Sequence, residues 1–115
     1  MMSDLANKHC KSCESGGDPL KKAAALACLE EIEGWEINED ATAINRTYQF
    51  KNYFQTLAFV NAVAWIAHQE NHHPTLTVDY NRCHVLYSTH AVKGLSENDF
   101  ICAAKVNALF ATGKE

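Results

Sequence analysis

The 115-residue chain lacks the hallmarks of several large functional classes. No stretch approaches the ~18 continuous apolar residues that a membrane-spanning helix needs. Residues 1–8 have no apolar core of a signal peptide, so we expect a cytoplasmic protein that does not enter the membrane. The sequence contains no GxGxxG, P-loop or GxSxG motif, so it does not support a nucleotide-binding fold. Its net charge of -4 argues against binding nucleic acid through bulk electrostatics.

The composition is that of one small domain with its own core. Hydrophobic residues make up 47% of the chain, enough for a core without metals or disulfides. The cysteine count of 5 is odd, which favours reduced thiols used as small hydrophobic side chains. We interpret residues 1–17, which end in Ser15-Gly16-Gly17, as a flexible tail, and residues 18–115 as a single domain.

The first predicted helix begins at Asp18-Pro19. Aspartate suits the N-cap, and proline suits the first helical position. Gly34 is a suitable stop. The apolar residues expected to share its buried side are Leu20, Ala23, Ala24, Ala27, Cys28 and Ile32.

The central helix is the clearest local pattern. Asn52 is a good N-cap, and Gln55 lies three residues later as in a capping box. Pro74 ends the helix and pushes His73 into extended backbone. The predicted buried stripe is broad and consists of Phe54, Leu57, Ala58, Ala62, Trp65 and Ile66, widened by Phe59 and Val63.

Four strands are predicted from alternating apolar and polar residues. They cover 35–37, 44–50, 76–80 and 83–90, with Asn81-Arg82 as the short link of a hairpin. Strands in sequential pairs indicate an antiparallel sheet, so the predicted fold class is α+β, in the order α-β-β-α-β-β-α, with helices on one face. An open four-stranded sheet leaves unprotected edges, which favours a homo-oligomer.

The last predicted helix opens at Ser96. Asp99 completes a capping-box-like pair with Ser96, and Leu95 and Phe100 occupy the staple positions. Gly113 is a fitting stop. The predicted buried side consists of Phe100, Ala104, Ala108 and Ala111.

Histidines gather around the end of the central helix and the second hairpin, at His68, His72, His73, His84 and His90. Histidine exchanges protons near neutral pH, because its unperturbed pKa is ~6.5. Several imidazoles around one pocket can protonate a leaving hydroxyl and remove a proton elsewhere.

Most of these polar residues also have a simpler structural explanation. His68 fits a solvated surface position as well as a site, and His84 fits packing or solvent. His90 ends a strand, where functional residues are common, but the pattern alone leaves its role open. Asp99 is explained as a helix cap, and Glu70 as a solvated carboxylate near the pocket mouth.

Metal binding is the weaker reading of the histidines. His68 and His72 have the i, i+4 spacing of a helical metal pair, but the glutamate that follows the first histidine of a metalloprotease helix is absent. Cys10 and Cys13, with His9 beside them, form half of a zinc site, and no second paired motif completes it. We therefore expect no metal.

The segment from His68 to Asp99 resembles the signature of the pterin-4a-carbinolamine dehydratases. The matching residues are spaced as in that family: His72-His73-Pro74, then Tyr80, His90 and Asp99. The surrounding residues are similar to bacterial members: Asn81-Arg82-Cys83, Ser88-Thr89-His90 and Gly94-Leu95-Ser96-Glu97-Asn98-Asp99-Phe100. The resemblance extends over about residues 18–112, and even the His9-Cys10 to Cys13 tail is similar to bacterial relatives.

The resemblance implies an α+β homodimer or homotetramer. It also implies conversion of 4a-hydroxytetrahydrobiopterin to quinonoid dihydrobiopterin and water, which restores the pterin after aromatic amino acid hydroxylation. No metal or organic cofactor is implied. The residues that would line the pterin pocket are His72, His73, Pro74, Thr89, His90, Ala91 and Val92.

The resemblance implies a different role for each histidine of this pocket. His73 and His90 would act as acid and base, in an order that stays open, while His72 orients the substrate. Asp99 and His68 would support the site. Many family members carry an acidic residue at the position of His68, so we expect the pH dependence to differ here.

Two alternatives remain from the sequence. Animal relatives also serve as dimerisation partners of a homeodomain transcription factor, and a regulatory association with an aromatic amino acid hydroxylase is the more fitting binding role for this chain. The second alternative is a metal-dependent hydrolase or sensor. Help to a hydroxylase that persists in a His90 variant would indicate the binding role. Loss of dehydratase activity on chelation, restored by zinc, would indicate the metal-dependent alternative.

Overall fold

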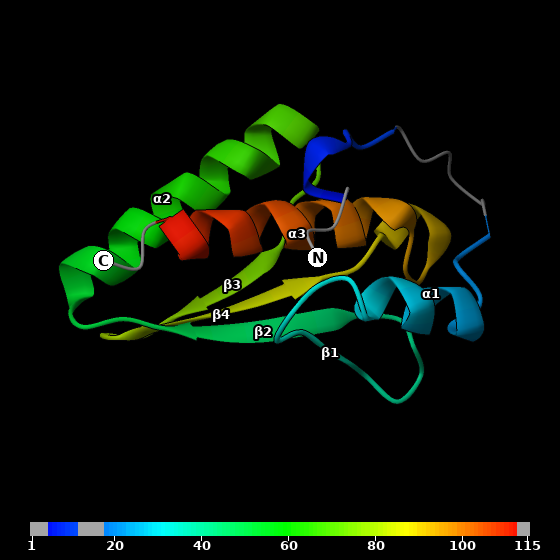
Figure 1. The fold of residues 1–115 in the computed structure, drawn as a ribbon, viewed down its shortest axis with the longest axis horizontal. Helices are drawn as coiled ribbons and strands as arrows, with labels where there is room; N and C mark the ends of the chain where they lie inside the picture. Colours follow the sequence, from blue (N-terminus) through cyan, green and yellow to red (C-terminus); the bar gives the residue numbers. More distant parts are fainter. Residues whose placement is uncertain (1–4, 12–17, 113–115) are drawn as a thin grey trace.

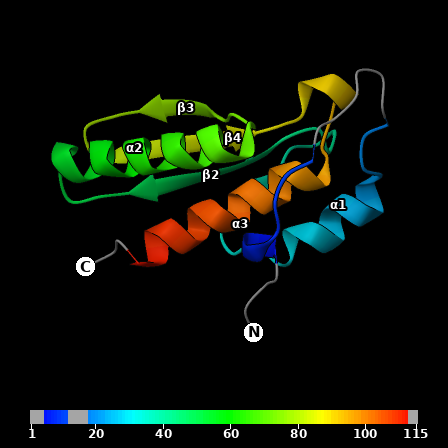
Figure 2. The ribbon, with the colours of Figure 1, turned by 90° about the horizontal axis from the view of Figure 1, so that it is seen from above.

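A computed structural model describes residues 5–11 and 18–112 of the protein. Its helices α1, α2 and α3 all cover the same face of a four-stranded sheet (Figure 1). Seen from above, α3 lies between α2 and α1 (Figure 2). The elements are η1 (Leu5–Asn7), α1 (Lys22–Leu29), β1 (Glu36–Ile37), β2 (Ile44–Gln49), α2 (Tyr53–Glu70), β3 (Thr75–Val78), β4 (Arg82–Tyr87), η2 (His90–Val92) and α3 (Glu97–Thr112).

The sheet has the strand order β1-β2-β4-β3, and every neighbouring pair is antiparallel. The predicted α+β class and element order are therefore confirmed. β4 is central, and its residues pair on one side with β2 and on the other with β3. β3 is an edge strand among the described residues, with one neighbour.

The alternation of β2 and β4 produces the apolar face that the helices cover. Alternate residues of each strand point to the same side of the sheet. The residues buried on this face are Ile44, Tyr48, Cys83, Val85 and Tyr87. They pack with α3, which buries Phe100, Ile101, Cys102, Ala103, Ala104 and Val106.

The start of α1 is a correction to the sequence prediction. The helix begins at Lys22 with Lys21 as an extended N-cap residue, so Asp18-Pro19 is not its first turn. The backbone N–H of Leu20 donates to the carbonyl of Leu95 at 2.7 Å. This tertiary bond anchors the chain just before Lys21, whose backbone is extended, and delays the helix by one turn.

The buried side of α1 also differs from the prediction. Ala25 is the buried residue of this helix, whereas the predicted residues Ala23, Ala24 and Ala27 are exposed. The helix ends at Leu29, before the predicted stop. Gly34 instead occupies a turn before β1 with φ +84, a backbone conformation that favours glycine.

The start of α2 forms as the sequence predicts, and the helix ends before Pro74 as expected. The Asn52 side chain accepts a hydrogen bond from the N–H of Gln55 at 2.8 Å. Gln55 reaches back to the N–H of Lys51 at 3.2 Å. At the other end, Asn71 adopts the left-handed conformation and caps the helix before His72.

The buried face of α2 was predicted wrongly in part. Phe59, Val63 and Ile66 are buried as expected, joined by Thr56 and Ala67. Phe54 and Trp65 are 81% and 59% exposed, and Leu57 and Ala58 are exposed too. The helix is apolar on more than one side, so its pattern could not tell which side meets the sheet.

The second hairpin and the last helix need smaller corrections. β4 already begins at Arg82, so the link is residues 79–81. In α3, Phe100 and Ala104 are buried as predicted, whereas Ala108 is exposed. The side chain of Ala111 and the predicted stop at Gly113 lie outside the described residues.

Part of the predicted flexible tail is described by the structure. Residues 5–11 pack beside α3, and Leu5 belongs to the core cluster. The rest of the first 17 residues lies outside the described part. Within the described ranges, no helix is both long and apolar enough to span a membrane.

Candidate active site

A hollow of about 610 Å³ opens where the end of α2 meets the segment after β4. We call it the histidine pocket. His72, His73 and His90 all line it, and the function suggested by the sequence depends on these three histidines sharing one pocket. The other lining residues are Cys10, Lys11, Gln69, Glu70, Asn71, Ser88, Thr89, Ala91 and Asn98.

The end of α2 places its two histidines differently. Asn71 turns the chain at φ 52, and the N–H of His72 still bonds to the carbonyl of Ala67 at 3.2 Å. The His72 side chain is 13% exposed, whereas His73 is exposed. One imidazole is therefore held inside the wall of the pocket, and the other stands at its open side.

A buried carboxylate holds the inner histidine. His72 Nε2 lies 2.7 Å from Oδ1 of Asp99, which is fully buried. Burial lowers the pKa of His72, but the hydrogen bond and the charge of Asp99 outweigh it, so this pKa lies above its ordinary value. His72 therefore keeps its proton to higher pH than a free imidazole.

Asp99 performs two tasks with its two oxygens. Its Oδ2 accepts from the N–H of Ser96 at 2.9 Å and from the hydroxyl of Thr89 at 2.7 Å. The N–H of Ser96 is the cap contact that the sequence predicted. The contacts to His72 and Thr89 could not be predicted from local spacing, because they join α3 to two other segments.

Tyr87 is a site residue that the sequence analysis did not identify. Its ring stacks on the His72 imidazole, with centroids 5.6 Å apart and planes 8° from parallel. Tyr87 is buried at the end of β4. Its ring and the Asp99 carboxylate together restrict the imidazole to one orientation.

Another part of the lining follows β4. Thr89 pairs with Gly94 in an isolated bridge, and the short helix η2 projects His90 from between them. His90 is exposed and Ala91 half-buried at the pocket. Val92 is buried and is not a lining residue.

Other predicted residues lie away from the pocket. His68 is exposed on α2, with its ring 5.8 Å from that of Trp65. Pro74 is half-buried just beyond the paired histidines and does not line the pocket. His84 bonds to Asn45 at 3.2 Å, and its side chain alternates with the buried residues of β4.

The environment of Glu70 differs most from the sequence prediction. Its side chain is 5% exposed, so it is not a solvated carboxylate. Burial raises its pKa, but hydrogen bonds from the Cys10 backbone and His9 and the charge of Lys105 outweigh this and lower it. No local signal showed that residues so far apart in the sequence would meet.

No metal centre is formed by the described residues. Among residues 5–11 and 18–112, no group of three His, Cys, Asp or Glu side chains is placed to hold a metal ion. Cys13, half of the partial zinc motif, lies outside these ranges.

Fold and pocket together define an α+β protein with a histidine-lined hollow at one end of its sheet. Residues 18–109 match the family model of the pterin 4 alpha carbinolamine dehydratases. The chain belongs to this family, whose members are hydro-lyases.

Similar proteins agree with this assignment. A Nitrosomonas eutropha protein named for pterin-4-alpha-carbinolamine dehydratase is 58% identical over 107 residues, covering 92% of this chain and 93% of its own. A Legionella pneumophila protein of the same name is 53% identical and covers 95% of this chain and 97% of its own. A crystal structure from Brucella melitensis, titled transcriptional coactivator/pterin dehydratase, matches with a TM-score of 0.76 and 30% identity, covering 80% of this chain and 98% of that chain.

Proposed function

We propose that this chain dehydrates a 4a-hydroxytetrahydropterin, with 4a-hydroxytetrahydrobiopterin as the model substrate. The C4a–O bond breaks, the hydroxyl leaves as water after gaining a proton, and N5 loses its proton. The nitrogen electron pair then forms the C4a=N5 bond of the quinonoid dihydropterin. The observation that carries the proposal is that His72, His73 and His90 share one ligand-sized pocket.

The two exposed histidines are suited to move these protons. His73 and His90 line the same pocket from different segments, so a substrate bound there can contact both imidazoles. Because both are exposed, each can exchange protons with water after a turnover. We assign the acid and base roles to this pair without dividing them.

His72 is suited to hold the substrate rather than to shuttle protons. Its Nε2 is engaged by Asp99, and its ring stacks on Tyr87. The raised pKa of His72 favours its protonated form, which can donate a hydrogen bond from its other nitrogen. Thr89, Ala91 and the backbone near His90 complete the proposed binding wall.

The test is a stopped-flow dehydration assay on freshly generated 4a-hydroxytetrahydrobiopterin, run against the spontaneous reaction. His90→Ala and His73→Ala should each lower kcat by about 100-fold or more, the usual loss for an acid or base. His84→Ala is the matched control, because His84 bonds to Asn45 and does not line the pocket. Wild-type protein that does not exceed the spontaneous rate would refute the proposal.

The physiological setting we propose is pterin recycling for an aromatic amino acid hydroxylase in the cytoplasm. Adding the protein to a hydroxylase reaction should relieve accumulation of the 4a-hydroxypterin. Relief that persists with His90→Ala would show that the protein helps by association instead of catalysis.

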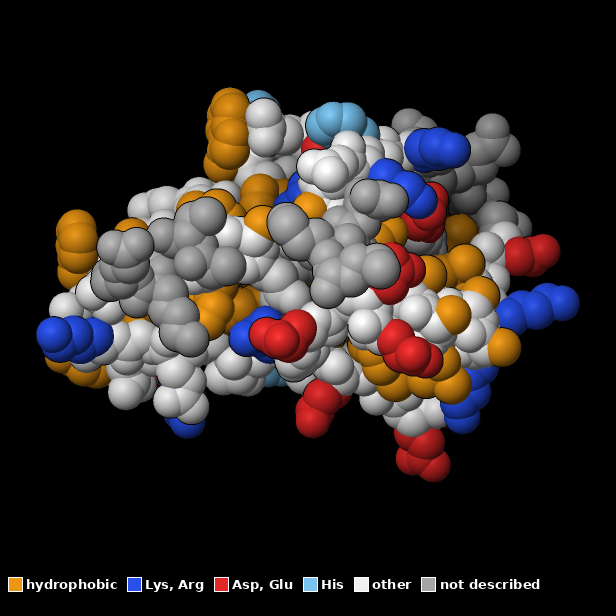
Figure 3. Space-filling model, in the orientation of Figure 1, with side chains coloured by type: hydrophobic (Ala, Val, Ile, Leu, Met, Phe, Trp, Pro, Cys, Tyr) orange, Lys and Arg blue, Asp and Glu red, His pale blue; other side chains and the backbone are white. Residues whose placement is uncertain are grey.

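We also propose that the protein is a homodimer or homotetramer. The apolar side of α2 that includes Phe54, Leu57 and Trp65 is uncovered, and Figure 3 shows hydrophobic side chains projecting from that edge. β3 offers an open strand edge as well. An exposed apolar helix face is typical of a surface that a second copy covers.

Light scattering coupled to gel filtration tests the assembly. Wild-type protein should have at least twice the chain mass of 12.8 kDa. Trp65→Ser should reduce the mass if α2 forms an interface. A monomer at micromolar concentration would contradict the oligomer.

A further inference from the structure

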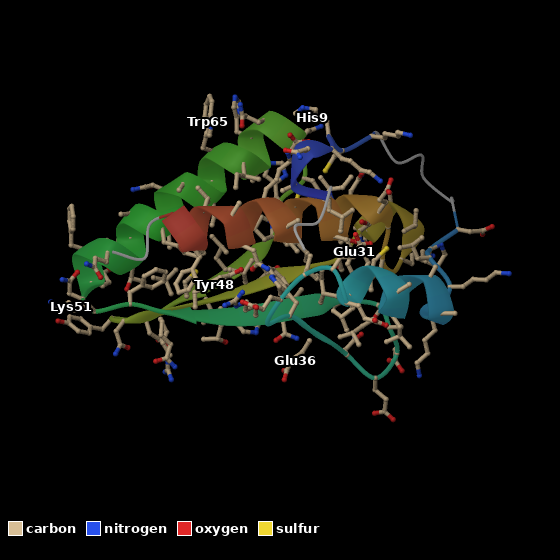
Figure 4. The ribbon with its side chains drawn as sticks, in the orientation of Figure 1. His9, Glu31, Glu36, Tyr48, Lys51 and Trp65 are labelled. Atoms are coloured by element: carbon tan, nitrogen blue, oxygen red, sulfur yellow. The ribbon has the colours of Figure 1, made fainter. Side chains whose placement is uncertain are left out.

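Residues 5–11, which we call the N-terminal strap, precede the part of the chain that the family model matches. The strap lies across the junction of α2 and α3, and Figure 4 shows His9 beside the end of α2. Leu5 fixes one end of the strap in the core. Cys10 and Lys11, at the other end, line the histidine pocket.

Glu70 is the first of three side chains that hold the strap. Its Oε1 accepts the backbone N–H of Cys10 at 2.7 Å, and its Oε2 lies 2.9 Å from Nδ1 of His9. A carboxylate that is 5% exposed needs partners, because an unpaired buried charge is costly. The strap supplies two of them.

Asn98 binds the strap from α3. Its Oδ1 accepts the N–H of Lys11 at 3.0 Å, and its Nδ2 donates to the carbonyl of the same residue at 2.6 Å. This side chain is on a buried residue, 7% exposed. The paired bonds fix the backbone of Lys11 at the pocket much as a neighbouring strand would.

Lys105 is the third anchor and lies outside the pocket lining. Its ammonium donates to the carbonyl of Ala6 at 2.8 Å and lies 3.9 Å from Oε2 of Glu70. Lys105 thus touches the strap and its main anchor without facing a ligand. Any effect it has on substrate binding must pass through other residues.

We propose that the N-terminal strap is a wall of the pterin pocket and that Glu70 and Lys105 are positioning residues that hold it there. The proposal rests on the proposed function for the identity of the ligand. The docked strap narrows the pocket beside His72 and raises affinity for the pterin. The acid and base residues are on other segments, so the strap acts on binding and leaves the chemical step unchanged.

A buried sulfur provides a direct measure of strap docking. The Sγ atom of Cys10 lies 3.5 Å from that of Cys102, which is fully buried beneath it. When the strap leaves, Cys102 loses its cover and becomes open to an alkylating reagent. Iodoacetamide labelling of Cys102, read by peptide mass spectrometry, therefore follows the strap independently of activity.

The experiment compares the full chain with Glu70→Ala, Lys105→Met, the double variant and Glu70→Gln. Glu97→Ala is the control, because its ion pair with Lys8 of the strap is exposed and contributes little. The first three should raise KM about five- to tenfold, with kcat within twofold, and should speed alkylation of Cys102. Glu70→Gln keeps an oxygen for the Cys10 N–H, so its KM should lie much closer to the wild-type value than that of Glu70→Ala. The Glu97 variant should match wild type in both measurements.

Three results would overturn the strap proposal: faster Cys102 alkylation with unchanged KM, raised KM with Cys102 still protected, or a double variant in which Cys102 stays protected. Circular dichroism checks that each variant folds. If Glu70→Ala does not fold, Lys105→Met still tests the strap. Binding of L-biopterin, measured by fluorescence, replaces KM if the wild type shows no turnover. An inactive wild-type protein would refute the dehydratase assignment. The Cys102 labelling and the L-biopterin binding would still show whether the strap forms a wall of the pocket.

Discussion

Replacing Asp99 with asparagine tests the electrostatic centre of the pocket. The asparagine side chain would keep an oxygen for the Ser96 N–H and the Thr89 hydroxyl, so the helix cap survives. The substitution removes the negative charge that faces His72 Nε2 at 2.7 Å. Because Asp99 is fully buried and the His72 side chain is only 13% exposed, solvent screens this interaction weakly. A hydrogen bond between charged groups contributes about 1.5–3 kcal/mol, so Asp99→Asn should lower the free energy of unfolding by about 2 kcal/mol at pH 5.5.

The loss should depend on pH in a defined direction. The pKa of His72 is raised in the folded protein, so its contribution to stability is complete below the unfolded pKa of ~6.5 and fades as pH rises through the folded pKa. At pH 8.5 a neutral imidazole can still accept a hydrogen bond from the asparagine amide. The cost of the substitution should therefore fall to about 1 kcal/mol or less.

Urea unfolding of wild type, Asp99→Asn, His72→Gln and the double variant from pH 5.5 to 8.5 measures this effect. In the His72→Gln background, the pH dependence of the Asp99 substitution should disappear, because the titrating partner is gone. An Asp99→Asn cost that is the same at both ends of the range would refute the reasoning. Persistence of its pH dependence without His72 would do so too.

Two further predictions concern stability and metal. Asn52→Ala removes the side-chain cap of α2 and should lower the free energy of unfolding by about 1 kcal/mol in the same urea assay, whereas Asn52→Asp should retain it. Dialysis against EDTA should leave dehydratase activity unchanged, and loss of turnover that zinc restores would instead favour a metal-dependent enzyme.

Local patterns predicted the element order and several element ends. Asn52 and Ser96 lie where helices start, and cap chemistry involves residues only a few positions apart. The alternation in β2 and β4 likewise identified the strands. These features are decided by neighbours along the chain, so the sequence displays them directly.

The errors arose where distant segments compete. The start of α1 is displaced by a backbone bond from Leu20 to Leu95, and no pattern near residue 18 records it. The broad apolar surface of α2 offered two sides, and contact with the sheet selected the side with Phe59 and Val63. Propensity and periodicity describe a segment alone, so they cannot rank such tertiary contacts.

For the site, the sequence by itself determined the chemistry available: paired histidines before a proline, His90 beyond a strand, and the spacing that resembles the dehydratase family. Only the tertiary structure decided how these groups are tuned. It set Asp99 against a histidine 27 residues away and brought Cys10 to Glu70 across 60 residues. Hydrogen bonding and burial depend on distances in space, and those distances exist only once the helices have packed on the sheet.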